Sequence, residues 1–222
     1  GPVVLDFAKN AQTGMVDYKP AHVDFIRSYK PVHVPSEATI EEAARLINNS
    51  VKPFALVGQG VELGEAREEL KALLEKAQIP AGCTMLGLSA LPTDHPLNMG
   101  MLGMHGNLGP NVMTNQCDLL IAIGMRFDDR VTGKLETYAK QARIIHFDID
   151  PSEINKNVKV DVAVVGNCKQ TLQRVTELVE PARHQAWVDG FKPYEDKEDY
   201  KVIQPAIHPT EGPLLMGEVV RA

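Results

Sequence analysis

Short, fully apolar segments alternate with segments of helical periodicity along the middle of the chain. The apolar segments read PFALVG, IPAGC, DLLIAIG, RIIHFDI and VDVAVVG. Helical patterns lie at 39–49, at about 63–77, and near 111–117, 152–157 and 168–179. Strands that are covered on both faces are apolar throughout, and their alternation with helices is typical of a parallel sheet. The pattern therefore predicts an α/β fold over 36–180, with a doubly wound, mostly parallel, Rossmann-like sheet.

Two of the helical patterns carry further signals. Thr39 is followed three residues later by Glu42, a spacing that predicts a capping box at the start of a helix. In the pattern at about 63–77, apolar side chains share one helical face. They are Ala66, Leu70, Leu73, Leu74 and Ala77.

The two ends of the chain lack this alternation. Residues 1–35 hold a short strand pattern at 3–7 and several prolines, which indicates a linker or an interdomain strap. Residues 181–222 are charged, aromatic and then proline-rich, which indicates a connector that packs loosely or wraps. The chain opens inside a strand-like pattern without Met, as is typical of a piece excised from a longer protein.

Composition excludes several classes of protein. The chain has 222 residues, 44% of them hydrophobic, and a net charge of −6, so it can bury a core and lacks the basic patch of a nucleic-acid-binding protein. The three cysteines are far apart, which fits neither a metal site nor a disulfide framework. No apolar run approaches the ~20 residues of a membrane span, and no signal peptide appears. A cytoplasmic protein without membrane or nucleic-acid partners is expected.

Ligands of such sheets bind at the carboxyl ends of the strands, so the residues after each apolar segment are the candidates. Gly58-Gln59-Gly60 follows the first segment; it is either a tight turn or a close approach of backbone to a ligand. Glu62 and Glu65 already complement the following helix N-terminus, which lowers the case for a phosphate there.

The segment 84–111 has little periodicity, and such a long loop inside a compact domain is usually functional. Glycines recur at every third position from 100 to 109, and five of the eight methionines lie at 85, 99, 101, 104 and 113. A Met-rich core plug is one interpretation. A ligand bed is favoured, because a core plug has little need for evenly spaced glycines.

The sequence RFDDR follows the segment DLLIAIG. Arg126 and Arg130 can hold a phosphate or a carboxylate, while Asp128 and Asp129 can fix the arginines or accept hydrogen bonds from ribose hydroxyls. The alternative is a knot of ion pairs within the loop.

Acidic residues accompany the last two apolar segments. Asp148 is a candidate for reading a ribose or an adenine edge, with Ile149 lining the ring, while Asp150 fits a helix cap before a proline. Asp161 opens the last segment and is a candidate or only a turn residue. His105 has no evident acid partner, and no nucleophile–base pattern occurs. The residues alone therefore predict a binding platform rather than a complete active site.

Several stretches resemble one enzyme family. MGMLGMHGNLGPNVMTNQCDLLIAIGMRFDDRVTG (99–133), IIHFDIDPSEINKNVKVDVAVVG, TMLGLSALPTDHPL and GPVVLDFAKNAQ are similar to the central domain region of the acetohydroxyacid (acetolactate) synthase large catalytic subunit. The resemblance covers about 1–180. It implies the central-domain fold of thiamine-diphosphate enzymes, a DHS-like NAD/FAD-binding domain. It also assigns 1–35 to the end of a pyrimidine-binding domain and a linker, 36–180 to the central domain, and 181–222 to a connector towards a third, diphosphate-binding domain.

The resemblance also implies an activity for the parent enzyme. This family uses thiamine diphosphate and Mg²⁺ to decarboxylate pyruvate and join the product to pyruvate or 2-oxobutyrate, in branched-chain amino acid biosynthesis. Its central domain binds FAD, which has no net redox role. The implied partners are the flanking domains of the same chain, further catalytic subunits in a homodimer or tetramer, and a small regulatory subunit.

Matching motif positions assigns the FAD contacts residue by residue. They are Gly58, Gly60, Thr84, Met85, Leu86, Leu102, Gly103, Met104, His105, Gly124, Met125, Arg126, Asp128, Arg130, Val131, Asp148, Ile149, Asp161 and Val162. The same match puts Met104, Asp129 and Arg130 at the substrate channel, where herbicides bind in this family.

This chain also departs from the family. Gln59 stands where the family often has Gly, and Ser89 replaces a usual Gly. The family's activating Glu belongs to the first domain, and its Mg²⁺ motif G-D-G, absent from this chain, belongs to the third. We therefore expect no catalytic or metal-binding residue here and no activity from the chain alone. An electron-transfer flavoprotein domain, and a structural module that binds a regulatory subunit with an empty cleft, are the alternatives.

Overall fold

The computed structural model describes residues 4–20, 22, 35–209 and 211–222, and the chain divides into two compact units, Gly1–Pro31 and Val32–Ala222. The described part of the first unit holds one short helix, α1 (Lys9–Thr13). The strand expected at 3–7 is wrong for residues 4–7, which form no strand and expose their apolar side chains. A strand needs a hydrogen-bonded neighbour, and none exists in the described part of this unit; Val3 lies outside the described residues.

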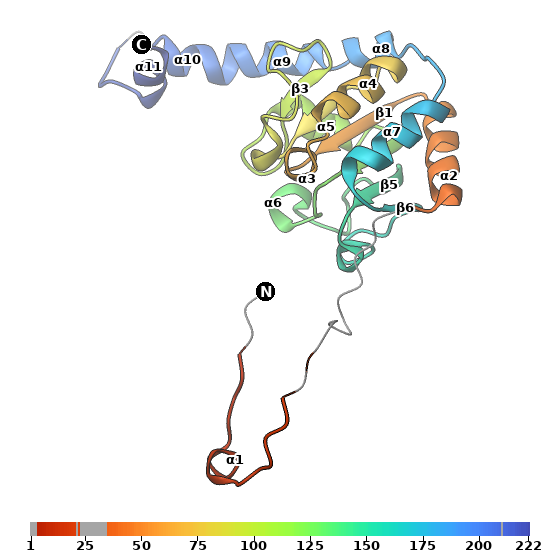
Figure 1. Ribbon diagram of the computed structural model, residues 1–222. Helices are drawn as coiled ribbons and strands as arrows, with labels where there is room; N and C mark the ends of the chain where they lie inside the picture. The colour runs from red at the N-terminus through yellow and green to blue at the C-terminus, as the bar shows by residue number, and fades with distance from the viewer. Residues whose placement is uncertain (1–3, 21, 23–34, 210) are drawn as a thin grey trace. The chain divides into compact units, whose positions relative to one another are not determined.

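The second unit contains a six-stranded sheet in the order β3-β2-β1-β4-β5-β6 (Figure 1). The strands are β1 (Pro53–Val57), β2 (Ala81–Cys83), β3 (Asn98–Met101), β4 (Leu119–Ile123), β5 (Arg143–Asp148) and β6 (Val162–Val165). All five neighbouring pairs are parallel. This is the strand order of dinucleotide-binding Rossmann folds. The α/β fold class predicted from the apolar segments is confirmed.

Helices cover both faces of the sheet. On one face α2 (Glu37–Asn48), α4 (Arg67–Ala77) and α7 (Cys168–Leu178) pack together (Figure 1). On the other face α5 (Leu108–Thr114) packs against α9 (Lys192–Glu198), and α8 (Gln185–Asp189) lies with them. β1 and β4 are buried along their whole length because both of their faces are covered. The core therefore consists of two apolar layers with the sheet between them.

Several element boundaries differ from the sequence prediction. α2 begins at Glu37, one turn earlier than expected, so the capping box is wrong and the Thr39 hydroxyl donates to the Ser36 carbonyl instead. The helix expected at about 63–77 begins only at Arg67, as α4, because Glu65 before it has a φ of 51°, and a separate short helix, α3 (Gly60–Leu63), precedes it. β3 was not predicted, since its short sequence NMGM lacks the β-branched residues that mark strands.

The helical patterns near 111–117 and 168–179 correspond to α5 and α7. The helix expected at 152–157 is wrong, since only a 3₁₀ turn (Pro151–Glu153) forms there. The carboxylate of Asp150 accepts a hydrogen bond from the Ser152 N–H, as expected of a cap.

The segment after residue 180 is more ordered than a loosely packed connector. After α8 and α9 come a π-helical turn (Asp199–Ile203), α10 (Gln204–Ile207) and α11 (Met216–Arg221). Trp187 and Phe191 are buried; their rings lie 5.6 Å apart, and the Trp187 Nε1 donates to the Pro53 carbonyl at 2.8 Å. Loose packing is thus wrong for 185–198, because aromatic side chains close the second apolar layer there.

Candidate functional site

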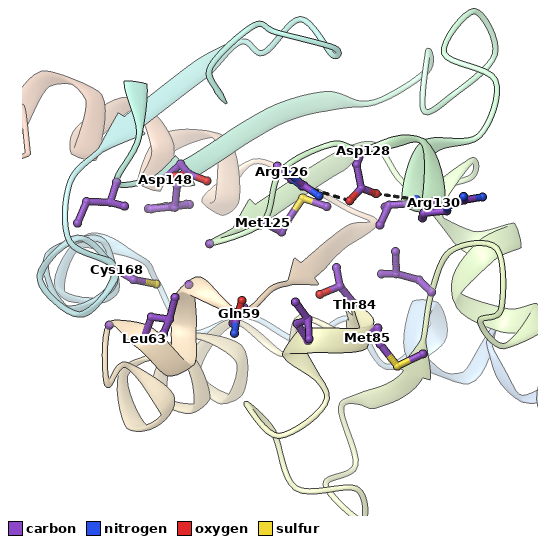
Figure 2. Close-up of a pocket in the computed structure, with 18 of the residues that line it drawn as sticks. Gln59, Leu63, Thr84, Met85, Met125, Arg126, Asp128, Arg130, Asp148 and Cys168 are labelled. Atoms are coloured by element: carbon purple, nitrogen blue, oxygen red, sulfur yellow. Dashed lines mark hydrogen bonds and ion pairs between the residues drawn. The ribbon is translucent and has the colours of Figure 1, made fainter. Parts of the chain in front are cut away.

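A pocket of about 1030 Å³ lies at the carboxyl edge of the sheet, and all six strands contribute the residues at or just after their ends (Figure 2). Most residues selected from the sequence line it: Gly60, Thr84, Met85, Leu86, Leu102, Met104, His105, Gly124, Met125, Arg126, Asp128, Arg130, Val131, Asp148 and Ile149. Figure 2 shows Asp148 and Cys168 on one side, Thr84, Met85 and Arg130 on the other, and Gln59 and Met125 between them.

The turns after β1 and β4 touch each other through their backbones. Gly124 has a φ of 58°, and a Cβ there would lie 2.6 Å from the Gly60 Cα. The Gly60 N–H donates to the Gly124 carbonyl at 2.8 Å. A Cβ on Gly58 would collide with the Gly124 carbonyl and Met125, and Gly58 does not line the pocket. Gly58 therefore serves the close approach of two strand exits, whereas Gly60 also faces the pocket.

The glycine-rich loop after β3 is held in place by backbone and amide contacts. Gly103 has a φ of 102°, and the Asn111 side chain bonds both its N–H and its carbonyl at 2.8 Å. The Met104 N–H donates to the Arg130 carbonyl at 2.7 Å. Gly103 itself does not line the pocket. The loop is therefore fixed to the neighbouring turn, with Met104 and His105 presented to the pocket.

The methionines divide between the two interpretations. Met99 and Met113 are buried in the second apolar layer, as a core plug requires. Met85 and Met104 are 61% and 59% exposed and, with Met101, line the pocket. Apolar side chains left open to a pocket provide a surface for a flat apolar ligand group.

Among the residues that the structure describes, the charged side chains at 126–130 form one ion pair, and Arg130 has no carboxylate partner. Asp128 caps the short helix α6 (Asp129–Thr132) through the Val131 N–H, and its carboxylate lies 3.3 Å from the Arg126 Nε. The Arg130 Nη1 lies 3.6 Å from the Met104 sulfur, and no carboxylate pairs with Arg130 among the described residues. Asp129 is exposed on α6 and does not line the pocket. Among the described residues, the ion pairing expected within this loop is thus limited to the pair between Arg126 and Asp128.

The exit of β5 carries a carboxylate above a buried imidazole. The Asp148 side chain is 12% exposed and accepts from the Asp150 N–H at 2.9 Å. The His146 ring beneath it is fully buried, with its Nε2 at 2.8 Å from the Met125 carbonyl oxygen and 3.5 Å from an Asp148 carboxylate oxygen. Ile149 is 61% exposed at the pocket. Sequence reasoning missed His146, although a polar residue within an apolar strand was its signal.

Residues 40–175 match the family model described as "Thiamine pyrophosphate enzyme, central domain". The chain belongs to this family.

Its relatives are longer proteins. The chain is 46% identical over 177 residues to the probable acetolactate synthase large subunit of Methanocaldococcus jannaschii, covering 78% of this chain and 30% of that protein. It is 42% identical over 198 residues to the acetolactate synthase large subunit of Corynebacterium glutamicum (86% and 32%). It is 38% identical over 205 residues to the acetolactate synthase isozyme 2 large subunit of Escherichia coli K12 (92% and 36%). These matches confirm the resemblance, and the chain spans about a third of the length of these relatives.

Two residues that the sequence proposed as ligand contacts of this thiamine pyrophosphate enzyme domain lie at the opposite edge of the sheet, where the strands begin. The Asp161 carboxylate accepts from the Ile144 N–H at 2.8 Å and the Arg143 Nε at 3.2 Å, where β5 begins. Asp161 and Val162 open β6 and do not line the pocket, so the structure does not bring them to the other candidates.

The exit of β6 contributes other residues, which sequence reasoning missed: Gly166, Asn167 and Cys168. Their signal was their position directly after the apolar segment, where the strand-end rule directs the search. Gln59, Leu63, Gly64, Met101 and Phe147 complete the lining.

Burial lowers the reactivity of the thiols of Cys168, which lines the pocket, and of Cys83. Burial, together with the negative charges of Asp148 and Glu69, raises the pKa of the Cys168 thiol to about 12, and burial raises the pKa of the Cys83 thiol to about 11. Such thiols stay protonated near neutral pH and are poor nucleophiles. The described part of the chain has no cluster of side chains suited to a metal ion, and its helices are not long and apolar enough to cross a membrane. The arrangement can bind and orient a ligand.

Proposed function

We propose that this chain is the central domain of an acetolactate synthase large subunit and that its pocket binds FAD. The observation that carries the proposal is the pocket itself, which joins all six strand exits and contains the carboxylate of Asp148 and the cation of Arg130, which pairs with no carboxylate of the described residues. Its volume of about 1030 Å³ lies at the upper end of the ~300–1,000 Å³ range of small-molecule sites. A dinucleotide fits such a volume better than a small 2-oxo acid.

The two sides of the pocket suit the two halves of FAD. Asp148 can accept hydrogen bonds from ribose hydroxyls, and the exposed Ile149 next to it can pack against an adenine ring. On the other side Met85, Leu86 and Met104 expose apolar surface for a flavin ring, and Arg130 can pair with a phosphate or with the flavin's polar edge. We assign the nucleotide half to the exits of β5 and β6 and the flavin half to the exits of β2 and β3.

We further propose the family's reaction for the parent enzyme. It condenses pyruvate with pyruvate or 2-oxobutyrate, and thiamine diphosphate, held with Mg²⁺ by other domains, supplies the carbanion chemistry. Met104 and Arg130, 3.6 Å apart at the pocket, would border the substrate channel together with Asp129 on α6. Because thiamine diphosphate and Mg²⁺ are assigned to other domains, we expect the chain alone to form no acetolactate.

The proposed partners follow from the same assignment. The relatives named above are large subunits, which supports a small regulatory subunit as a partner, beside flanking domains of the same chain and further catalytic subunits in a dimer or tetramer. We keep 1–35 as the end of a preceding domain and 36–180 as the body of the central domain. Because 185–198 pack on the sheet, the connector proper begins after α9.

A titration of the chain with FAD, followed by quenching of flavin fluorescence, tests the proposal. We expect saturable binding that Arg130→Ala and Asp148→Ala each weaken by about tenfold, as for the loss of one charged hydrogen bond of ~1.5 kcal/mol. Arg183→Ala removes an exposed arginine away from the pocket and is the matched control, with unchanged affinity. No saturable binding, or binding that ignores both pocket substitutions, would contradict the proposal.

A further inference from the structure

A buried imidazole joins two strand exits beneath the pocket. His146 lies on β5 with no exposed surface, and it does not line the pocket itself. Its Nε2 lies 2.8 Å from the carbonyl oxygen of Met125, at the exit of β4. The same nitrogen lies 3.5 Å from a carboxylate oxygen of Asp148, at the exit of β5. Both Met125 and Asp148 line the pocket, so His146 contacts two parts of its wall.

The contact with a carbonyl defines which nitrogen carries the proton. A carbonyl oxygen only accepts hydrogen bonds, so the Nε2 of His146 must donate, and in the neutral ring the Nδ1 is then an acceptor. That Nδ1 is buried without a hydrogen-bond partner in the described part of the chain. The ring is held on another side by Phe127, with centroids 5.1 Å apart and planes at 68°. His146 is therefore fixed by one donated hydrogen bond and by packing.

A structural role alone does not account for this residue. The neighbours of His146 on β5, Ile145 and Phe147, are buried apolar side chains, and an apolar residue at 146 would avoid burying an unpaired nitrogen. An apolar residue could not provide the N–H donor that lies between the Met125 carbonyl and the Asp148 carboxylate. The Met125 carbonyl and the Asp148 carboxylate both carry negative charge, and the Nε2–H, with Nε2 at 2.8 Å from the first and 3.5 Å from the second, offsets the repulsion between them.

We propose that His146 is a positioning residue for the nucleotide half of the ligand. Its Nε2–H holds the Met125 carbonyl beside Asp148, and this fixes the direction in which the Asp148 carboxylate meets a ribose that carries two neighbouring hydroxyls. The inference rests on the proposed function, because it assigns Asp148 to the ribose of a bound dinucleotide. His146 itself would not touch the ligand; it would act through Asp148, which does.

The test compares side chains at position 146 that do or do not place an N–H donor at the position of Nε2, and it uses the whole chain. His146→Gln keeps an N–H at the reach of Nε2, whereas His146→Leu removes it. The dissociation constants for FAD, ADP and riboflavin are measured for each variant below its unfolding temperature. We expect His146→Leu to weaken FAD and ADP on the order of tenfold, as for other residues that orient a ligating group, and to leave riboflavin unchanged. His146→Gln should restore ADP binding to within a few-fold of the unchanged chain.

The outcomes separate the inference from the proposed function. Unchanged ADP affinity in His146→Leu, an equal loss of riboflavin binding, or a Gln variant as weak as the Leu variant would each overturn the positioning role. If His146→Leu does not fold, His146→Asn takes its place, because its amide reaches only the position of Nδ1; binding equal to that of the Gln variant would then overturn the role. Absence of FAD binding by the unchanged chain would instead contradict the proposed function, and the inference with it.

Discussion

At the scale of single residues, the pocket depends on glycines where two backbones meet. Gly124 combines a positive φ with a hypothetical Cβ contact of 2.6 Å to Gly60, so both its conformation and its surroundings exclude a side chain. Gly133 also has a positive φ, of 55°, but a Cβ there would meet nothing within 4 Å. A comparison of Gly124 and Gly133 therefore distinguishes the effect of an unfavourable φ, which both have, from that of a steric collision, which only Gly124 has.

Gly124→Ala should destabilise the chain by about 3 kcal/mol or more, because the turns after β1 and β4 must separate. Gly133→Ala should cost less, ~1–3 kcal/mol, because it forces a side chain into a sparsely populated backbone conformation (φ 55°, ψ −121°) without a collision. Urea denaturation of both variants measures the difference. Equal losses of unfolding free energy in the two variants would show that the contact between Gly60 and Gly124 is unimportant.

The buried thiol of Cys168 should make stability depend on alkaline pH. Burial raises its pKa in the folded chain to about 12 from the ordinary 9.0, so the unfolded chain loses this proton first as the pH rises. The stabilising contribution is complete below pH 9 and is lost as the pH rises towards 12. In Cys168→Ala the unfolding free energy should fall less steeply between these pH values than in the unchanged chain; parallel pH profiles would contradict this.

At the scale of elements, the C-terminal helices hold the glycine-rich loop. The Glu198 carboxylate on α9 accepts from the Leu108 N–H at 3.0 Å and from the Asn107 amide at 3.2 Å, at the start of α5. The Asn107 side chain in turn accepts from the Met101 N–H at 2.9 Å, and Met101 lines the pocket. A segment far along the sequence thus supports one wall of the site.

Glu198→Ala should lower the free energy of unfolding by ~1 kcal/mol, the usual effect of losing a helix cap. It should also weaken FAD binding, because the loop loses its support. Glu195→Ala on the same helix is the control, since no hydrogen bond joins its side chain to the loop in the described part of the chain. Thermal unfolding and FAD titration of both variants give the measurement, and indistinguishable variants would rule out the support.

The elements also show what the sequence could predict. Five of the six strands follow from their apolar runs, because full burial on both faces leaves a strong pattern. β3 does not, since the sequence NMGM has little strand character and pairs only because β2 lies beside it. The burial of Trp187 and Phe191 was not predicted, because both lie within a charged segment of the sequence. Tertiary packing, which local sequence does not encode, decides such cases.

The same limit applies to the site. The strand-end rule brought most candidates together because the carboxyl ends of parallel strands meet at one edge of the sheet. Asp161 was selected at the beginning of its strand and lies at the opposite edge. His146 could not be recognised as a pocket support, because its partner Met125 comes from another strand exit.

At the scale of the whole molecule, the sheet domain extends to the end of α9. Trp187 and Phe191 are buried, while Tyr200, Val202 and Val220 are largely exposed. We therefore expect the residues that stability requires to end between 191 and 200.

A chain ending at residue 198 should unfold cooperatively, with a stability close to that of the full chain. A chain ending at residue 183 loses both aromatic side chains, each worth ~3–5 kcal/mol when a large core residue is removed, and should lose its cooperative transition. Calorimetry of the two truncated chains tests this. A cooperative, stable 183-residue chain would show that the second apolar layer closes without α8 and α9.

We propose that FAD binds at the carboxyl edge of this sheet. Backbone amide chemical shifts, followed by two-dimensional NMR as FAD is added, test it most directly because they report every part of the sheet at once. We expect saturable shifts at 84–86, 124–131, 148–149 and 166–168, and unchanged resonances for Arg143, Ile144 and Asp161 at the opposite edge. Absence of shifts, or shifts centred on Asp161, would contradict it.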